Sequence, residues 1–252
     1  MAAFVEDTSI VKQIWGKSDT ILLVFAGASA EFALNKAVDW LYFTGKLPKD
    51  PLGRLFSTVY YAKKIVFSEK NTALKAIDQI TTIHATVEER RGQKIPEWAY
   101  KDVLFMLIDY SIRSYELLQR PLSLEEKQEI LDVFVSVGRR MGLKQLPLTY
   151  SKFKGIRHQH LQQNLLNGKL SKDLYKQYRK HLGFVRYNLL LEAQILLVPA
   201  RVRQLLNLRS LSLLKPFITV YKVFRSLRMD WLLKELLLPP AYKEDIKRMN
   251  IT

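Results

Sequence analysis

The 252-residue chain has no cysteine, and this absence removes several classes of site at once. Without thiols there is no disulfide, no thiolate nucleophile, no Cys-ligated zinc or iron–sulfur cluster, and no covalently attached c-type haem. Any metal must be held by histidine, carboxylate, lysine, tyrosine or a cofactor. Four histidines are present, and their spacing fits none of the common histidine-rich metal motifs. His158 and His160 would point in different directions on a helix, and we expect both at the solvated surface.

Glycine and proline are also scarce, at 10 and 9 residues, and this scarcity disfavours a sheet built on many turns. Leucine, lysine, arginine, glutamate and glutamine are plentiful, and all of them favour helices. The sequence shows no internal repeat, low-complexity tract or flexible linker. We therefore expect an all-α fold in which residues 1–252 form one globular multi-helix bundle, with the basic helices of residues 149–252 as part of it.

Long uncharged apolar runs are missing as well. The longest candidate, from Thr20 to Ala30, ends at Glu31 and is shorter than the roughly 18 residues that a membrane-spanning helix needs. The first residues include Glu6 and Asp7, where a signal peptide would carry basic residues. These features predict a cytoplasmic protein, with peripheral attachment to a membrane as an open alternative. Phosphate-binding loops, nucleophile elbows and HExxH motifs are absent, which argues against the common kinase and hydrolase classes.

Positive charge, by contrast, is abundant and unevenly distributed. The net charge is +16, and residues 149–252 contain 20 Lys and Arg against 6 Asp and Glu. No acidic residue lies between Glu192 and Asp230, and the cations of this acid-free stretch are Arg201, Arg203, Arg209, Lys215, Lys222, Arg225 and Arg228. Such a stretch predicts an anionic partner: a membrane surface, nucleic acid or an acidic protein. Nucleic acid has the weakest support, because no zinc finger, aromatic RNA-binding motif or leucine zipper is present.

Apolar periodicity, caps and breakers predict a series of helices. We expect a long buried helix over residues 20–44, followed by helices over 52–67 and 71–91. Ser123 and Glu126 form a capping-box pattern that predicts the start of another helix. Further helices are expected over 98–118, 124–141, 171–182, 185–197, 200–206, 211–228 and 230–237, with a basic helix between Thr149 or Ser151 and Asn164. The helix over 211–228 suits either a membrane surface or packing on the domain with a solvated basic side.

His84 is the candidate functional residue of the helix expected over residues 71–91. It shares one helical face with residues that recur at steps of three and four, namely Leu74, Ile77, Ile80 and Val87. An imidazole on such an apolar face is either a hydrogen-bonded interior histidine or a ligand for a cofactor.

Short motifs occur along the chain in an informative order. Residues 50–58 read DPLGRLFST, and residues 83–87, about one helix later, read IHATV. Further motifs are YFTG at 42–45, Tyr115-Glu116, PLS at 121–123, residues 138–142, LPLT at 146–149, and Val198-Pro199. Together they resemble the MpaB-like oxygenases, a family that includes the latex-clearing rubber oxygenase, and the resemblance covers most of the chain.

The resemblance implies a fold, a cofactor and its ligands. In the latex-clearing members a noncovalent haem b lies inside a helical, globin-like bundle, so a globin-like core is implied here. The proximal histidine, which would be the metal ligand, corresponds to His84. The distal arginine and threonine correspond to Arg54 and Thr58, which would be the catalytic residues. Together with Ser57, these residues would line the cofactor site.

Two positions depart from the family pattern. The lysine that can coordinate the iron in latex-clearing proteins is Ser57 here, and serine is a poor neutral ligand for iron. The iron would then be five-coordinate, bind water, or be coordinated from elsewhere, for example by Lys63 or Lys64. A tryptophan–valine–histidine run of many relatives is replaced by DVL at residues 102–104.

The sequence therefore predicts a haem b-dependent oxygenase or peroxidase-like enzyme acting on an apolar, lipid-like or unsaturated substrate. The physical requirements agree, because haem needs an apolar slot between helices, one imidazole at the iron, and polar groups beside it. The alternative is a non-catalytic helical module that binds anionic membrane surfaces or acidic partners through the acid-free stretch.

Overall fold

The structure is a computed structural model that describes residues 3–45 and 49–226, apart from the side chains of residues 51–52, 54–56 and 223–226. The helices are α1 (Ile10–Trp15), α2 (Ser18–Leu34), α3 (Val38–Thr44), α5 (Pro51–Phe67), α6 (Lys70–Arg91), α7 (Glu97–Leu118), α8 (Leu124–Arg140), α9 (Tyr150–Gln163), α10 (Lys169–Leu197), α11 (Ala200–Leu205) and α12 (Lys215–Ser226). Extended pairing within the described residues is limited to two isolated bridges. The predicted all-α fold is therefore confirmed.

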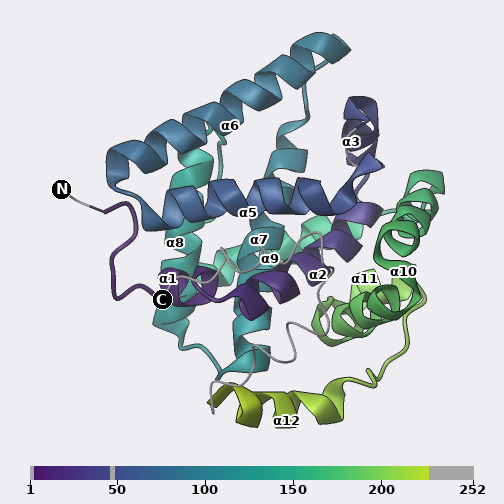
Figure 1. Ribbon diagram of the computed structural model, residues 1–252. Coiled ribbons are helices and arrows are strands. Elements are labelled where there is room, and N and C mark those ends of the chain that lie inside the picture. The colour runs from purple at the N-terminus through teal and green to yellow at the C-terminus, as the bar shows by residue number, and fades with distance from the viewer. Residues whose placement is uncertain (1–2, 46–48, 227–252) are drawn as a thin grey trace.

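The main apolar core lies around α7, which occupies the middle of the bundle (Figure 1). α2 packs directly on α7 and is buried along most of its length. The ring of Tyr110, on α7, packs against the backbone of α2 at Gly27, where an added Cβ would lie 2.3 Å from Cδ1 of Tyr110. Tyr110 is fully buried, so its ring has no space to move aside. Glycine is needed here for close packing of two central helices.

Gly27→Ala is expected to lower the free energy of unfolding by about 1–3 kcal/mol, the usual cost of overpacking a filled core. Gly155→Ala, in α9, is the matched control, because no described atom beyond the neighbouring turns of its own helix backbone lies within 4 Å of its Cβ position. Alanine there is expected to raise stability by about 0.5–1 kcal/mol, since it favours the helix without a clash. Urea denaturation measures both changes, and equal destabilisation by the two substitutions would contradict this packing.

The long helix expected over residues 20–44 is wrong, because the chain breaks into α2 and α3 at Asn35. Asn35 has an extended backbone, and its side-chain Nδ2 donates to Oδ2 of Asp102 at 2.8 Å. Asn35 also forms an antiparallel bridge with Leu165, and the N–H of Lys36 donates to the carbonyl of Asn164 at 2.9 Å. These long-range bonds replace the backbone hydrogen bonds that a continuous helix would form here. We call the connection made by Asn35 and Lys36 with Asp102, Asn164 and Leu165 the Asn35 clamp.

Most predicted helix ends are confirmed in atomic detail. Asp50 caps α5 by accepting from the N–H of Gly53 at 2.8 Å, with Pro51 at the first turn. Ser123 and Glu126 form a reciprocal capping box at α8. Gly92 ends α6 in the left-handed conformation. Local chemistry was sufficient to predict these boundaries.

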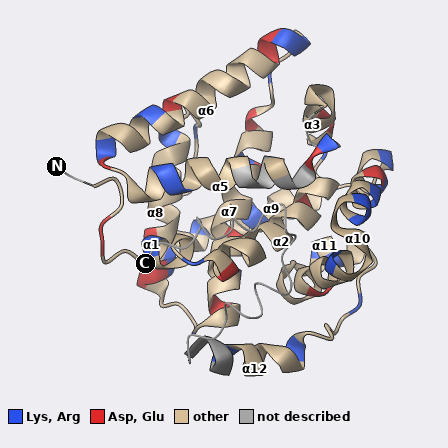
Figure 2. Ribbon diagram, in the orientation of Figure 1, with Lys and Arg blue, Asp and Glu red and all other residues tan. Residues whose placement is uncertain are grey.

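The C-terminal helices differ in part from expectation. The helices expected over 171–182 and 185–197 are the two arms of α10, which kinks at Gly183, where φ is 71°. The helix expected over 211–228 is α12, which begins four residues later, at Lys215, and the one over 230–237 lies outside the described residues. Figure 2 shows basic and no acidic residues along α12. None of the helices in the described ranges is both long and apolar enough to cross a membrane.

Candidate active site

α5 and α6 form a pair of neighbouring helices that carries the predicted cofactor residues (Figure 1). The chain turns at Ser68 and Glu69, and the two helices diverge from this corner (Figure 1), so we compare residues by their distance along each helix from it. Arg54 lies about as far from the corner along α5 as His84 lies along α6. Thr58 lies one turn nearer the corner. The fold thus places both α5 residues on the helix beside the one that carries His84.

α6 is packed closely only in its first half. Its buried residues are Ala73, Ala76 and Ile77. Further along, His84 and Val87 are half-buried, whereas the residues between them that face outward are exposed. The face predicted from the apolar periodicity is therefore the inner face of α6, and around His84 it is less tightly covered than near the corner.

The ring of His84 rests against Tyr100 of α7. The two ring centres are 5.1 Å apart and the planes meet at 71°, an edge-to-face contact. The hydroxyl of Tyr100 donates to Oε1 of Glu88 at 3.2 Å, and Glu88 also accepts from the N–H of Ile95 at 2.9 Å. Burial, together with the charge of Glu88, raises the pKa of Tyr100 above its usual range. Tyr100 therefore remains a neutral phenol that fixes one side of the imidazole.

The α5 residues differ in their exposure. Thr58 is half-buried, whereas Ser57, which was expected to line the cofactor site, is exposed. The side chain of Arg54 is not among those that the structure describes. Lys63 and Lys64 are half-buried, and burial lowers the pKa of Lys63. Both lysines lie more than a turn nearer the corner than Thr58.

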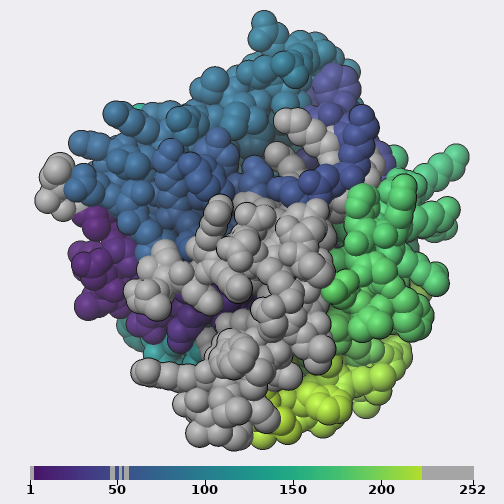
Figure 3. Space-filling model, viewed as in Figure 1, coloured from purple at the N-terminus to yellow at the C-terminus, as the bar shows by residue number. Residues whose placement is uncertain are grey.

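α3 closes the far end of this region against the last turn of α6. The Nη2 atom of Arg91 pairs with Oδ2 of Asp39 at 2.6 Å. The guanidinium carbon of Arg91 lies 4.0 Å from the ring centre of Trp40 and 5.5 Å from that of Phe43. Figure 3 shows α3 and the end of α6 next to each other at the upper right of the surface. Asp39 is thus the ion-pair partner of Arg91.

Other motifs of the resemblance lie at the corner between α7 and α8. Tyr115 is buried, and its neighbour Glu116 accepts from the N–H of Leu122 at 3.1 Å. Glu116 also pairs with Lys127 at 2.8 Å. These residues hold the turn that contains the Pro-Leu-Ser motif, so their role here is to join two helices.

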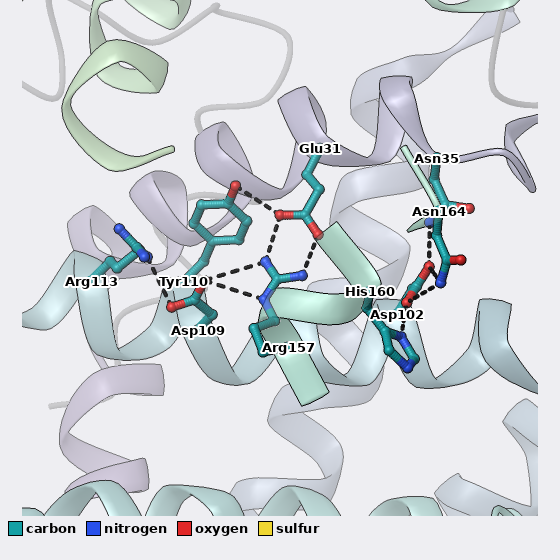
Figure 4. Close-up of polar contacts among 9 residues, drawn as sticks. All are labelled: Glu31, Asn35, Asp102, Asp109, Tyr110, Arg113, Arg157, His160 and Asn164. Carbon is teal, nitrogen blue, oxygen red and sulfur yellow. Dashed lines mark hydrogen bonds and ion pairs between the residues drawn. The ribbon is translucent and has the colours of Figure 1, made fainter. Parts of the chain in front are cut away.

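A buried ionic cluster near the centre of the bundle was not predicted from the sequence (Figure 4). Both terminal nitrogens of Arg157, on α9, donate to the carboxylate of Glu31, on α2, at 2.5 Å. Arg157 also pairs with Asp109 of α7 at 3.3 Å, and the hydroxyl of Tyr110 donates to Glu31 at 3.1 Å. Only 5% of the Arg157 side chain and 1% of the Glu31 side chain are exposed. This cluster ties α2, α7 and α9 together.

A second buried cluster forms around Asp102, and it corrects the prediction for His160 (Figure 4). His160 is not at the solvated surface: 15% of its side chain is exposed, and its Nδ1 hydrogen bonds to Asp102. Asn35 and Asn164 also donate to the same carboxylate, at 2.8 and 2.9 Å. His158 is exposed, as expected. Asp102 therefore accepts the side-chain hydrogen bonds that hold the Asn35 clamp together.

Comparison with known proteins agrees with the resemblance. Residues 16–227 match the family described as ER-bound oxygenase mpaB/B'/Rubber oxygenase, catalytic domain. No curated protein and no solved structure matches the chain. The matched region includes α5, α6 and α7, and hence Arg54, Thr58, His84 and Tyr100.

Proposed function

The chain belongs to the mpaB and rubber oxygenase family of oxygenases, and we propose that it depends on a noncovalent haem b with His84 as the iron ligand. The observation that carries this proposal is the position of His84. Its imidazole lies on the inner, apolar face of α6, where it is only half-buried, about as far from the α5–α6 corner as Arg54 is along α5. Imidazole on an apolar face between helices is what a haem requires.

The residues along the inner face of α6, from Ile80 to Arg91, suit a haem in their chemistry. The inner face of α6 supplies Ile80 and Val87, and α3 supplies the rings of Trp40 and Phe43. A macrocycle that is largely apolar needs such surroundings, with few polar groups directed at the metal. The incomplete burial of His84 and Val87 supports a ligand on this face.

The roles of the individual residues follow from their positions. When bound, haem would supply the redox chemistry of the oxygenase reaction. His84 would hold the iron, and Tyr100 would restrict rotation of the imidazole by its edge-to-face contact. Thr58 would donate a hydrogen bond and Arg54 would supply a positive charge where negative charge develops in the reaction. The apolar surroundings would favour an apolar, lipid-like or unsaturated substrate.

Titration of the purified, full-length protein with haemin tests the proposal. A saturable Soret band and a freshly purified protein that is coloured are the expected results. The iron-free protoporphyrin is expected to bind more weakly, because it lacks the bond to His84. A colourless protein that takes up no added haemin would overturn the proposal.

A second observation favours contact with an anionic membrane surface. α12 packs inward through Tyr221, whose hydroxyl donates to Oδ2 of Asp19 at 2.9 Å. Its apolar residues Phe217 and Val220 are instead exposed, at 63% and 51%. Leu213, just before the helix, is similarly exposed. A helix with exposed apolar residues in an acid-free stretch is typical of an interfacial helix, and we propose that it attaches this oxygenase peripherally to anionic lipid.

Vesicle flotation tests the membrane contact. The protein is expected to float with phosphatidylcholine–phosphatidylserine vesicles, less so with pure phosphatidylcholine, and less at high salt. The double substitution Phe217→Ser and Val220→Ser is expected to weaken binding by about tenfold or more, since each apolar side chain contributes roughly 1.5–3 kcal/mol when buried. Leu148→Ser, at an equally exposed leucine before α9, is the control and should have no effect. Equal losses in both variants would contradict a specific role of α12.

A further inference from the structure

Arg91 occupies the end of the face on which His84 lies. It is the last residue of α6 and follows His84 by seven residues, which is two turns of helix. The two side chains therefore share one face, separated by a rise of about 10 Å. This separation is comparable with the reach from the iron of a haem to the carboxylates of its propionate groups.

The described residues satisfy only part of the hydrogen-bonding capacity of the Arg91 guanidinium. Its Nη2 atom is bound by Asp39, and its flat face lies on the ring of Trp40. Its Nη1 atom is buried, and among the described residues it has no hydrogen-bond partner. A buried N–H of a charged group without an acceptor is costly, so such a group points to a ligand or to a missing acceptor.

We propose that Nη1 of Arg91 donates a charge-assisted hydrogen bond to a propionate carboxylate of the haem. This inference rests on the proposed function, because it requires haem beside His84. The geometry supports a carboxylate over other acceptors, since a guanidinium can bind two carboxylates through its separate nitrogens. Asp39 already takes one side, and 43% of its side chain is exposed, so water screens its charge from a second anion. Trp40 and Phe43 would lie beside the edge of the macrocycle.

The test compares haemin with haemin dimethyl ester, in which the propionate charges are removed. Arg91→Gln is expected to weaken haemin binding by about tenfold or more, the effect of losing one hydrogen bond to a charged group. The Arg91→Gln variant should bind the dimethyl ester with the same affinity as the unsubstituted protein. Arg90→Gln is the matched control, because Arg90 is the exposed neighbour on the same turn and should leave both affinities unchanged. Soret titration gives the affinities without any measurement of activity.

The outcomes separate this inference from the function on which it depends. Binding of both porphyrins by the unsubstituted protein, with equal weakening of both by Arg91→Gln, would show that Arg91 only supports α3, and would overturn the inference alone. Unchanged haemin affinity in Arg91→Gln would overturn it as well. Failure of the unsubstituted protein to bind either porphyrin would overturn the proposed function and the inference together.

Discussion

Arg157→Met is expected to lower the free energy of unfolding by about 3–5 kcal/mol, the cost of removing one partner of a buried ion pair. The substitution leaves the carboxylate of Glu31 in the core without its cation, whereas Asp109 keeps its ion pair with Arg113. Glu31 would keep only the hydroxyl of Tyr110 as a donor among the contacts of this cluster. Because these residues join α2, α7 and α9, the loss should appear as global unfolding in chemical denaturation.

Two companion variants establish the cause of this loss. Arg113→Met removes a cation from the same Asp109, but 40% of the Arg113 side chain is exposed, so a change of about 1 kcal/mol or less is expected. The double substitution Arg157→Met and Glu31→Met replaces the central pair by apolar groups and should recover a large part of the stability. A single Arg157→Met variant as stable as the Arg113→Met variant would contradict the importance of the buried cluster.

His84→Ala is expected to lower the affinity for haemin by more than about 100-fold, because even residues outside the first shell of a metal site cost roughly 10- to 100-fold when mutated. The Soret band should weaken or vanish, while the far-ultraviolet circular dichroism stays unchanged, since His84 is only half-buried. Added imidazole should restore part of the absorption by entering the space left by the side chain.

His158→Ala is the matched control for this prediction. His158 is exposed on α9, away from α6, so its removal should alter neither haemin binding nor stability. Retention of the full Soret band in His84→Ala would show that another residue holds the iron. Equal loss in both histidine variants would show that uptake of haemin is nonspecific.

Much of the fold could be predicted because its boundaries are set by neighbouring residues. The cap at Asp50, the capping box at Ser123 and the stop at Gly92 depend on contacts within one turn, so the sequence alone indicates them. The break at Asn35 could not be predicted in the same way. Its helix is interrupted by bonds to Asp102 and Asn164, which lie 67 residues or more away along the chain.

In the candidate site, too, the features set by nearby residues could be predicted and those set by distant residues could not. The apolar period of three and four residues placed His84 on the inner face of α6 without any knowledge of its neighbours. Its contact with Tyr100 and the position of Arg91 against α3 required the packed helices. One signal for the buried cluster was present, because Arg157 lies four residues from both Phe153 and Leu161, which are buried on the same face of α9.

The Asn35 clamp has a consequence for the order of assembly during synthesis. It joins the start of α3 to Asp102 and to residues 164–165, so the clamp cannot be complete until the chain beyond α9 has left the ribosome. Contacts between distant parts of a chain also form slowly, because a long loop must close first. Nascent chains that end before α9 should therefore contain α5 and α6 but lack a fixed α3. Full capacity to retain a ligand beside His84 should be acquired only after residues 164–165 have emerged.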